Sequence, residues 1–332
     1  MKKLTRQPAV KLLSISLAAL ALLTGQAASA LNLDKPITIV VPTAPGGGND
    51  AMARIIATKM GVLMKATFIV ENKAGANGAI AAEYVAHAVP DGNTLMWGYI
   101  GTHSTSPALQ KLKYDPINDF EPVGLTAYSP ILMVATPALS KTLSVKSNKE
   151  LLAALIATKG KYSYASAGTG TGPHFAAELF KLSTGADWIH VPYKGNAPGI
   201  TDTIGGQTQV MFPSLFSAVP FVKSGRLNAI AVAGSKRSTT LPDVPTLKEL
   251  GINGVDVTQW YGIFAPAKTP KAVITQLNTA LNQVLRDKDT IKKIEDQGGD
   301  VEGSTPEELK KLVASELVKW KRVVQQAKIT AE

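Results

Sequence analysis

The chain contains no cysteine among its 332 residues. This absence excludes disulfide bonds, thiolate catalysis and metal sites built on thiolates. It also excludes a lipoprotein, because the lipid would be attached to a cysteine at the cleavage point. An exported protein without disulfides fits the bacterial periplasm, where a large hydrophobic core makes covalent staples unnecessary.

Long apolar runs are also scarce, and the clearest one, Leu12 to Leu23, is short for a bilayer-spanning helix. Basic residues precede it, and the triplet Ala28-Ser29-Ala30 follows it. This order is typical of a secretory signal peptide over residues 1–30, with a membrane anchor as the less favoured alternative. We therefore expect a soluble, monomeric periplasmic protein that begins at Leu31.

A strong excess of charge is missing as well. The leader contains four of the 35 basic residues and none of the 25 acidic ones, so the remainder carries a net charge of +6. This charge suits the capture of anions, but it is too weak and too scattered to indicate nucleic-acid binding. About 300 residues are too many for one simple core and favour two lobes.

Short β-rich runs alternate with helical stretches from Ile37 onward, which is typical of a parallel α/β sheet. The same rhythm restarts after Tyr128 and continues to about residue 254. The C-terminal part is mostly helical, and its last helix, capped by Thr305, has an apolar stripe that needs a surface to cover. We predict lobe 1 over residues 31–132 and 255–332, and lobe 2 over residues 133–254.

The first glycine-rich loop joins the strand that ends at Pro42 to a helix that begins near Asn49. Its residues Thr43, Ala44, Pro45, Gly46 and Gly47 lie where ligands bind in open α/β sheets. Glycines let a ligand approach the backbone, and the free N–H groups of a helix start favour an anion. An ordinary glycine turn is an equal alternative on position alone.

The second loop has the same strand–loop–helix architecture in the second lobe. It comprises Ser166, Ala167, Gly168, Thr169, Gly170 and Thr171, and His174 follows in the first helical turn. The helix dipole disfavours a charged His174, so we expect a neutral donor there, or a packed, hydrogen-bonded histidine.

A third loop contains Tyr193 and Lys194. Tyr193 could line a cleft or fill it when no ligand is bound. A lone lysine such as Lys194 is more often a solvated surface charge than an anion site.

Motifs of catalysis are absent: the sequence has neither GxSxG nor HExxH, and its four histidines make no metal pattern. We expect no catalytic residue, no metal and no cofactor. A dispersed Ser-His-Asp triad stays open, so a periplasmic hydrolase remains one alternative function.

Many ordered blocks of the sequence resemble one family, the Bug-type extracytoplasmic solute-binding proteins of tripartite tricarboxylate transporters. The blocks are VPTAPGGGND (41–50), VENKAGANGAIAAEYVAHAVPDGNTL (70–95), YDPINDFEPVG (114–124), YASAGTGTGPHFAAELFKLSTG (164–185), HVPYKGNAPGITDTIGGQTQVMF (190–212), LPDVPTLKELG (241–251) and WYGIFAPAKTP (260–270).

The resemblance implies a type II periplasmic-binding-protein fold: two α/β lobes with a ligand cleft and a hinge. It implies that the two glycine-rich loops, with His174, grip a carboxylate, and that the loop with Thr102 and His103 faces the same cleft. It also implies large and small membrane subunits as partners.

One position departs from many relatives, which have an acidic or amide residue where this chain has Pro213. The absence of an acidic or amide side chain at this position argues against an amino-acid ligand with a free ammonium group. The resemblance therefore implies a small di- or tricarboxylate, aliphatic or aromatic such as a phthalate isomer, that is captured by hinge closure. A ligand-presenting sensor subunit is the second alternative function.

Overall fold

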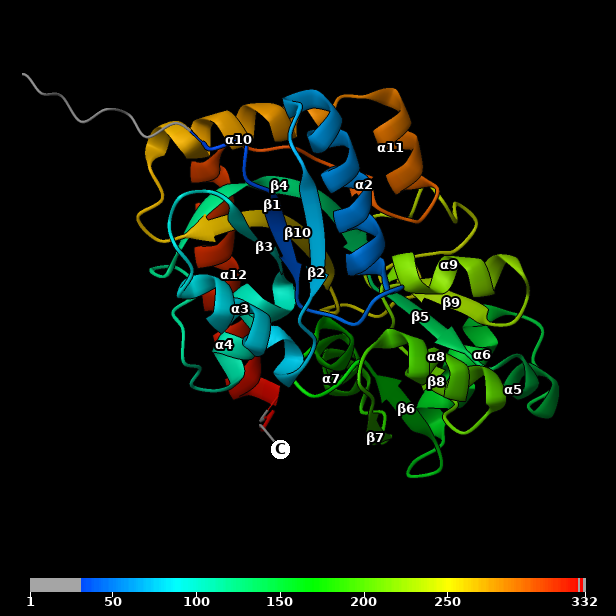
Figure 1. Cartoon of the computed structure of the whole chain (residues 1–332). Coiled ribbons are helices and arrows are strands. Elements are labelled where there is room, and N and C mark those ends of the chain that lie inside the picture. Colours follow the sequence, from blue (N-terminus) through cyan, green and yellow to red (C-terminus); the bar gives the residue numbers. More distant parts are fainter. Residues whose placement is uncertain (1–30, 328, 331–332) are drawn as a thin grey trace, which may run out of the picture.

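The structure is a computed structural model that describes residues 31–327 and 329–330. It contains two β-sheets with helices packed around them, which is the predicted α/β class (Figure 1). The expected leader over residues 1–30 lies outside the described residues.

The first sheet has six strands in the order β11-β4-β10-β3-β1-β2. Strands β1, β2 and β3 pair in parallel, as predicted, but β10 runs antiparallel between β3 and β4. The sheet is therefore mixed and not parallel throughout. The bounds are β1 (Ile37–Val41), β2 (Phe68–Asn72), β3 (Thr94–Tyr99), β4 (Phe120–Pro130), β10 (Thr258–Pro266) and β11 (Asp300–Val301).

The helices around this sheet come from both ends of the chain. They are α2 (Gly48–Met64), η1 (Ala76–Gly78), α3 (Ala79–Ala86), η2 (Gly101–Thr105), α4 (Ser106–Leu109), α10 (Lys271–Val284), α11 (Lys288–Glu295) and α12 (Pro306–Ala327). Of these, α10 and α12 pack on β4, and α2 packs on β2.

The second sheet has five strands in the order β7-β6-β8-β5-β9. Its bounds are β5 (Leu132–Ala135), β6 (Ser163–Ser166), β7 (Ile189–Pro192), β8 (Val210–Met211) and β9 (Asn228–Val232). Its helices are α5 (Pro137–Thr142), α6 (Asn148–Ala157), α7 (Gly172–Thr184), α8 (Asn196–Gly205) and α9 (Leu215–Lys223).

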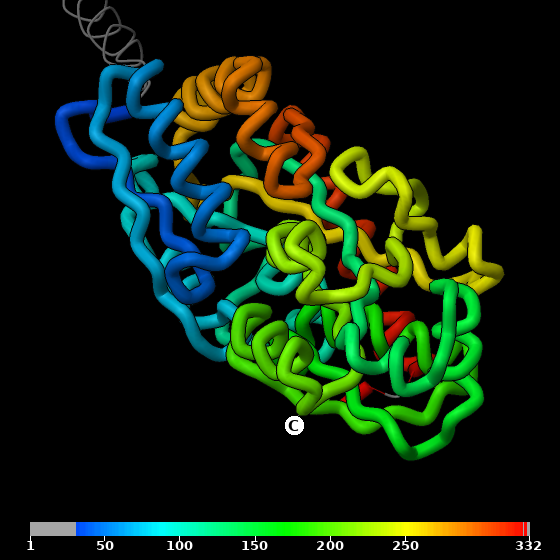
Figure 2. The backbone as a smooth tube through the Cα atoms, turned by 90° about the vertical axis from the view of Figure 1, so that its right-hand side faces the viewer, coloured from blue at the N-terminus to red at the C-terminus, as the bar shows by residue number. Residues whose placement is uncertain are grey.

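Two stretches of chain cross between the sheets, and they are hydrogen-bonded to each other. The Ile131 N–H donates to Val257 O at 3.3 Å, and the Val257 N–H donates to Ala233 O at 2.8 Å. In Figure 2 the blue and orange parts of the chain gather at one end, and the green parts gather at the other. The predicted lobe boundaries stay a prediction.

The last helix, α12, covers the first lobe as predicted. The Thr305 and Glu308 side chains cap it reciprocally, since each accepts a hydrogen bond from the backbone N–H of the other. Buried residues Leu309, Val313 and Trp320 face β4, η2 and α4. Trp320 also meets Phe175 of α7 edge-on, with ring centroids 5.1 Å apart, so this helix touches both lobes.

Several elements were not predicted, above all the long central strand β10. Its residues are buried on both faces, so the period-two alternation that marks a half-exposed strand is absent. Helix α11 and the helical turn η2 were missed as well.

Within the part of the chain that the structure describes, no helix is both long enough and apolar enough to cross a membrane.

Candidate ligand-binding site

The loop between β1 and α2 is shaped by glycine and by one carboxylate. Gly46 has φ +81°, a left-handed conformation that glycine adopts without a steric penalty. Gly47 occupies the N-cap position with no side-chain cap, so the first N–H groups of α2 have no cap from that residue. Asp50 in the first turn accepts a hydrogen bond from the Gly46 N–H at 2.9 Å, which folds the loop back onto the helix.

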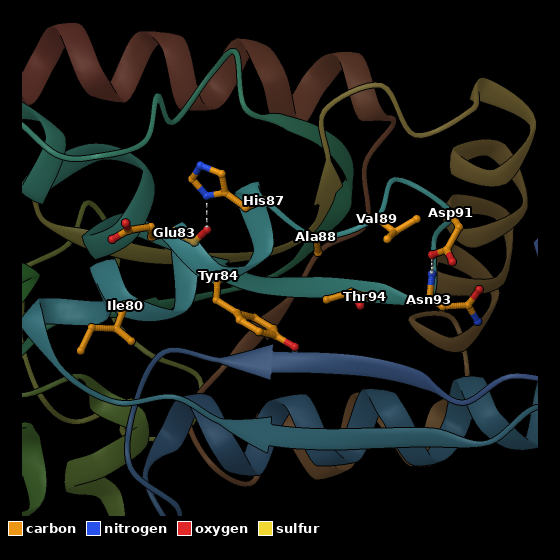
Figure 3. A pocket seen from close by; sticks show the side chains of 9 residues that line it. All are labelled: Ile80, Glu83, Tyr84, His87, Ala88, Val89, Asp91, Asn93 and Thr94. Atoms are coloured by element: carbon orange, nitrogen blue, oxygen red, sulfur yellow. Dashed lines mark hydrogen bonds between the residues drawn. The ribbon is translucent and has the colours of Figure 1, made fainter.

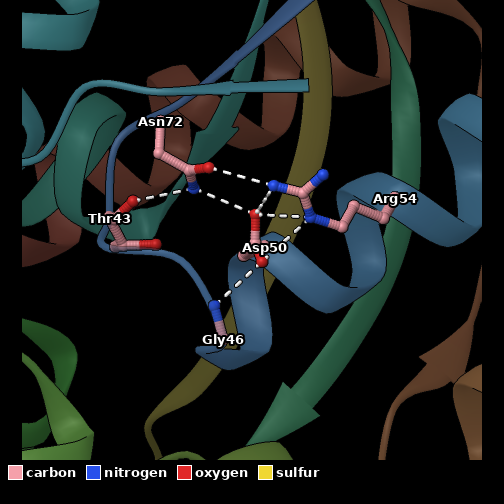
Figure 4. A network of polar contacts seen from close by, with 5 residues as sticks. All are labelled: Thr43, Gly46, Asp50, Arg54 and Asn72. Atoms are coloured by element: carbon pink, nitrogen blue, oxygen red, sulfur yellow. Dashed lines mark hydrogen bonds and ion pairs between the residues drawn. The ribbon is translucent and has the colours of Figure 1, made fainter. Parts of the chain in front are cut away.

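Asp50 is the centre of a polar network (Figure 4). Arg54 Nε and Asn72 Nδ2 donate to it at 3.0 and 2.9 Å, and Asn72 Nδ2 also donates to the Thr43 carbonyl. Burial alone would raise the pKa of Asp50, but the hydrogen bonds from Arg54, Gly46 and Asn72 lower it below its ordinary value. The ionised carboxylate therefore fixes both ends of the loop.

The Thr43 hydroxyl takes no part in this hydrogen-bond network. Its Oγ1 is buried and has no hydrogen-bond partner among the described residues, whereas Ala44, Pro45 and Gly46 are exposed. A buried polar atom without a partner costs free energy unless a ligand or water satisfies it.

The loop between β6 and α7 is held by hydrogen bonds of hydroxyl and backbone groups. The Ser166 hydroxyl lies 2.7 Å from His190 Nε2 and accepts from the Gly168 N–H. Thr171 caps α7 by accepting from the His174 N–H, and its hydroxyl donates to Gly168 O at 2.7 Å. Thr169 Oγ1 is buried and, within residues 31–327, has no partner.

His174 lies in the first turn of α7, is 5% exposed and stacks on His190 with ring centroids 4.3 Å apart. Its Nδ1 accepts a hydrogen bond from the Gly170 N–H. Burial, assisted by His190, lowers the pKa of His174 to about 4, so the ring is neutral at physiological pH. Tyr164 also stacks on His190, so Tyr164, His190 and His174 form a column of three rings.

The two loops approach each other's lobes. A Cβ on Gly48 would lie 2.6 Å from the ring of Phe216, which is in α9. A Cβ on Gly170 would lie 3.1 Å from Leu109 and 3.4 Å from the Asn77 amide of the first lobe. At Gly48 a side chain would collide with the Phe216 ring, and at Gly170 the φ of +82° already favours glycine.

Two residues that are predicted to bind the ligand, Tyr193 and Pro213, make hydrogen bonds within the second lobe. The Tyr193 hydroxyl donates to Asp202 in α8 at 2.7 Å, and burial together with Asp202 raises the pKa of Tyr193 to about 12. Pro213 is buried between β8 and α9, and its carbonyl accepts from the Leu132 N–H. Lys194 is exposed.

The loop of Thr102 and His103, which is predicted to face the cleft, is buried, and its part in ligand binding stays a prediction. Both side chains are fully buried, and His103 stacks on Phe264 with ring centroids 3.9 Å apart. Burial lowers the pKa of His103 to about 3. The π-helical turn η2 directs this histidine into the core of the first lobe, and the sequence contained no sign of that turn.

Sequence reasoning also missed Asn196, the first residue of α8. Its Nδ2 donates to the hydroxyls of Ser214 and Ser217, and its Oδ1 is buried without a partner in the described chain. Gln259 of β10 was missed too, although its side chain lies beside Gly172 at the start of α7. For Asn196, the sequence signal that could have indicated it is Gly195, the glycine directly before it.

Neither of two cavities found elsewhere involves the predicted loops. One of about 740 Å³ lies beside α3 and is lined by residues such as Ile80, Tyr84 and His87 (Figure 3). Another of about 350 Å³ lies where the chain crosses between the lobes.

The chemistry of the site is that of binding. Ser166 and His190 form a hydrogen bond, but Ser166 is fully buried and also accepts from a backbone N–H, so it is not an exposed nucleophile. The described residues contain no group of three or more His, Asp or Glu that could hold a metal ion. What the loops offer is backbone N–H groups, hydroxyls and helix starts, which suit an anion.

A chain with two α/β lobes and glycine-rich loops at the strand ends of each lobe is a periplasmic binding protein in its architecture. A family model described as tripartite tricarboxylate transporter family receptor matches residues 52–329. The chain belongs to this receptor family, whose members are periplasmic solute-binding receptors and not enzymes.

The relatives agree with this assignment. The protein BugT of Bordetella pertussis is 31% identical over 88% of this chain and 89% of its own length. The structure of Rpa4515 from R. palustris with adipate is 32% identical, with a TM-score of 0.83 over 89% of this chain and 98% of the other. MatC from Rhodopseudomonas palustris with bound malate is 35% identical, with a TM-score of 0.79 over 87% and 98%.

Proposed function

We propose that the chain is a periplasmic receptor that binds a small dicarboxylate between its lobes and delivers it to the large and small membrane subunits of a tripartite tricarboxylate transporter. The observation that carries this proposal is the pairing of two loops, one per lobe, each with a buried and unpartnered hydroxyl within the described chain: Thr43 and Thr169. Residues 1–30 would serve as the cleaved export signal.

The binding mechanism uses the starts of α2 and α7. The first N–H groups of α2 and the two hydroxyls would donate to carboxylate oxygens, and the dipoles of both helices would favour the negative charge. A few charge-assisted hydrogen bonds at roughly 1.5–3 kcal/mol each, offset by ordering costs, are enough for the roughly −8 kcal/mol of a micromolar receptor.

Ligand-induced closure follows from contacts that exist only when the lobes meet. A ligand that touches both loops stabilises the closed state by its differential contacts. The bound adipate and malate of two relatives support an aliphatic dicarboxylate. An aromatic dicarboxylate, such as a phthalate isomer, is the alternative that a screen would separate.

The test begins with a thermal-shift screen of mono-, di- and tricarboxylates on residues 31–332, followed by calorimetry. We expect Thr43→Val and Thr169→Val each to weaken binding about tenfold. The melting temperature of the ligand-free protein should hardly change, because neither hydroxyl has a partner in the described chain. Thr279→Val, on the exposed face of α10, is the matched control.

Binding of no carboxylate, or unchanged affinity in both variants, would refute the proposal. In cells, deletion should abolish uptake of the ligand. Loss of gene induction with intact uptake would instead favour the sensor role.

A further inference from the structure

The cavity of about 350 Å³ at the lobe crossover has walls from both lobes. Tyr128 and Pro130 come from the end of β4, and Trp260 comes from β10. Gly234 to Arg237 follow β9 of the second sheet, and Glu316 belongs to α12. Gly234 lies against the hinge itself, because its Cβ would be 3.4 Å from Pro130 and from Thr258.

This cavity lies on the opposite side of β10 from the candidate carboxylate site. Successive side chains of a strand point to opposite faces. Gln259 points toward Gly172 at the start of α7. Its neighbour Trp260 therefore points the other way, toward α12, where it lines the cavity with Glu316. A molecule bound here would not compete with a ligand between the glycine-rich loops.

The charges around the cavity are unequally paired. Arg237 bonds to Glu249 and Lys319 bonds to Glu316. Asp256, Asp300 and Glu302 also line the cavity, and the described residues offer them no ion-pair partner. Lys236 is the remaining cation of the lining. The cavity therefore has an excess of unpaired carboxylates over unpaired cations.

The indole of Trp260 adds an unused donor. This residue is 1% exposed, and its Nε1 is buried without a hydrogen-bond partner among residues 31–327 and 329–330. A buried N–H without an acceptor is costly, and an oxygen atom of a ligand would remove that cost. A molecule that complements this lining would therefore carry both a positive charge and an oxygen acceptor.

We propose that this cavity binds a basic amino acid, such as arginine or lysine, and that its occupancy strengthens carboxylate binding in the other site. The α-ammonium group and the side-chain cation of such an amino acid would pair with Asp256, Asp300 and Glu302. Its carboxylate would accept a hydrogen bond from Trp260 Nε1 and pair with Lys236. A cavity of this volume falls in the range of small-molecule sites.

The coupling has a structural origin. The lining segment Ser235 to Arg237 extends from the second sheet, whereas α12 covers the first. A molecule that fits between them stabilises the lobe arrangement in which Gly48 meets Phe216 and Gly170 meets Leu109. By linkage, a ligand that stabilises this state raises the affinity of every other ligand that prefers it. The coupling rests on the proposed function; the binding of the amino acid does not.

The direct test is calorimetry with L-arginine and L-lysine on residues 31–332, without carboxylate. Binding should be measurable and should weaken about tenfold in the double variant Asp300→Asn/Glu302→Gln and in Trp260→Phe. Agmatine, which lacks the carboxylate of arginine, should bind more weakly than arginine. Asp34→Asn is the control, since this residue is exposed and far from the lining in sequence.

The linkage test repeats the carboxylate titration with saturating arginine. The carboxylate dissociation constant should fall at least threefold in the wild type and stay unchanged in Asp300→Asn/Glu302→Gln. Absence of arginine binding, or binding that the lining variants do not affect, overturns the proposal. Binding of arginine with unchanged carboxylate affinity overturns the coupling, whereas absence of all carboxylate binding refutes the proposed function alone.

Discussion

The two glycine-rich loops have the same local architecture but are held in place by different forces. In the first lobe, ions hold the loop: Asp50 bridges the Gly46 N–H, Arg54 and Asn72 (Figure 4). In the second lobe, stacked rings hold it: a column of Tyr164, His190 and His174, with hydroxyl hydrogen bonds. A similar binding surface can therefore be built on a network around a buried carboxylate or on a column of stacked rings, and the two supports should respond differently to mutation, pH and salt.

The largest effect should come from removing the ionic support. Asp50→Ala deletes a buried carboxylate that accepts hydrogen bonds from three groups, so we expect the free energy of unfolding to fall by about 4 kcal/mol. Urea denaturation would measure this, with Asp34→Ala as an exposed control. A loss below about 1 kcal/mol would mean that ions do not hold the first loop.

Acid should weaken the column of stacked rings first, because it contains the buried, neutral His174. The pKa of His174 is about 4 in the folded protein and near 6.5 when unfolded, so the unfolded chain binds more protons between these values. The contribution is complete above pH 6.5 and is lost as the pH falls toward 4, by roughly 3 kcal/mol. The buried His103 acts in the same direction.

The variant His174→Gln separates the contribution of His174 to the pH dependence of stability from that of His103. Its unfolding free energy should depend less on pH between 6.5 and 4 than that of the wild type, whereas the exposed control His87→Gln should follow the wild type. Asp50, with its lowered pKa, should lose its contribution only below about pH 4, its ordinary range. Equal pH profiles for wild type and His174→Gln would contradict the claim that a neutral His174 supports the second loop.

A smaller effect tests how closely the loops must approach. Gly48→Ala places a Cβ 2.6 Å from the Phe216 ring, so it should oppose closure and weaken ligand binding about tenfold, or 1.4 kcal/mol. Phe216→Leu in the same chain should restore part of the affinity. Gly205→Ala, which meets no atom of the described chain within 4 Å, is the control. Calorimetry with the ligand found by screening gives the measurement.

The smallest effect should be that of Arg54. Its side chain is 51% exposed, so its ion pair with Asp50 is screened by solvent, and Arg54→Gln should cost about 1 kcal/mol or less. The cost should shrink further between 0.05 and about 0.5 M salt. A larger, salt-independent loss would show that the pair behaves as a buried one.

The two loops illustrate what could be predicted from the sequence. Gly46 and Gly170 stood between a strand pattern and a helix start, and local chemistry placed them at strand ends. His103 could not be placed, because a single histidine does not reveal which face of its turn meets the core. The bond from Ser166 to His190 joins residues 24 positions apart in different strands, and no local pattern encodes it.

Strand β10 imposes an order on assembly. It enters the first sheet between β3 and β4, although more than a hundred residues of chain separate it from both. The second sheet has all its strands once residue 232 has been made, whereas the first sheet remains split until residue 266 arrives. The lobe that begins the chain must therefore mature last, and truncation before β10 should leave the later lobe as the better-formed fragment.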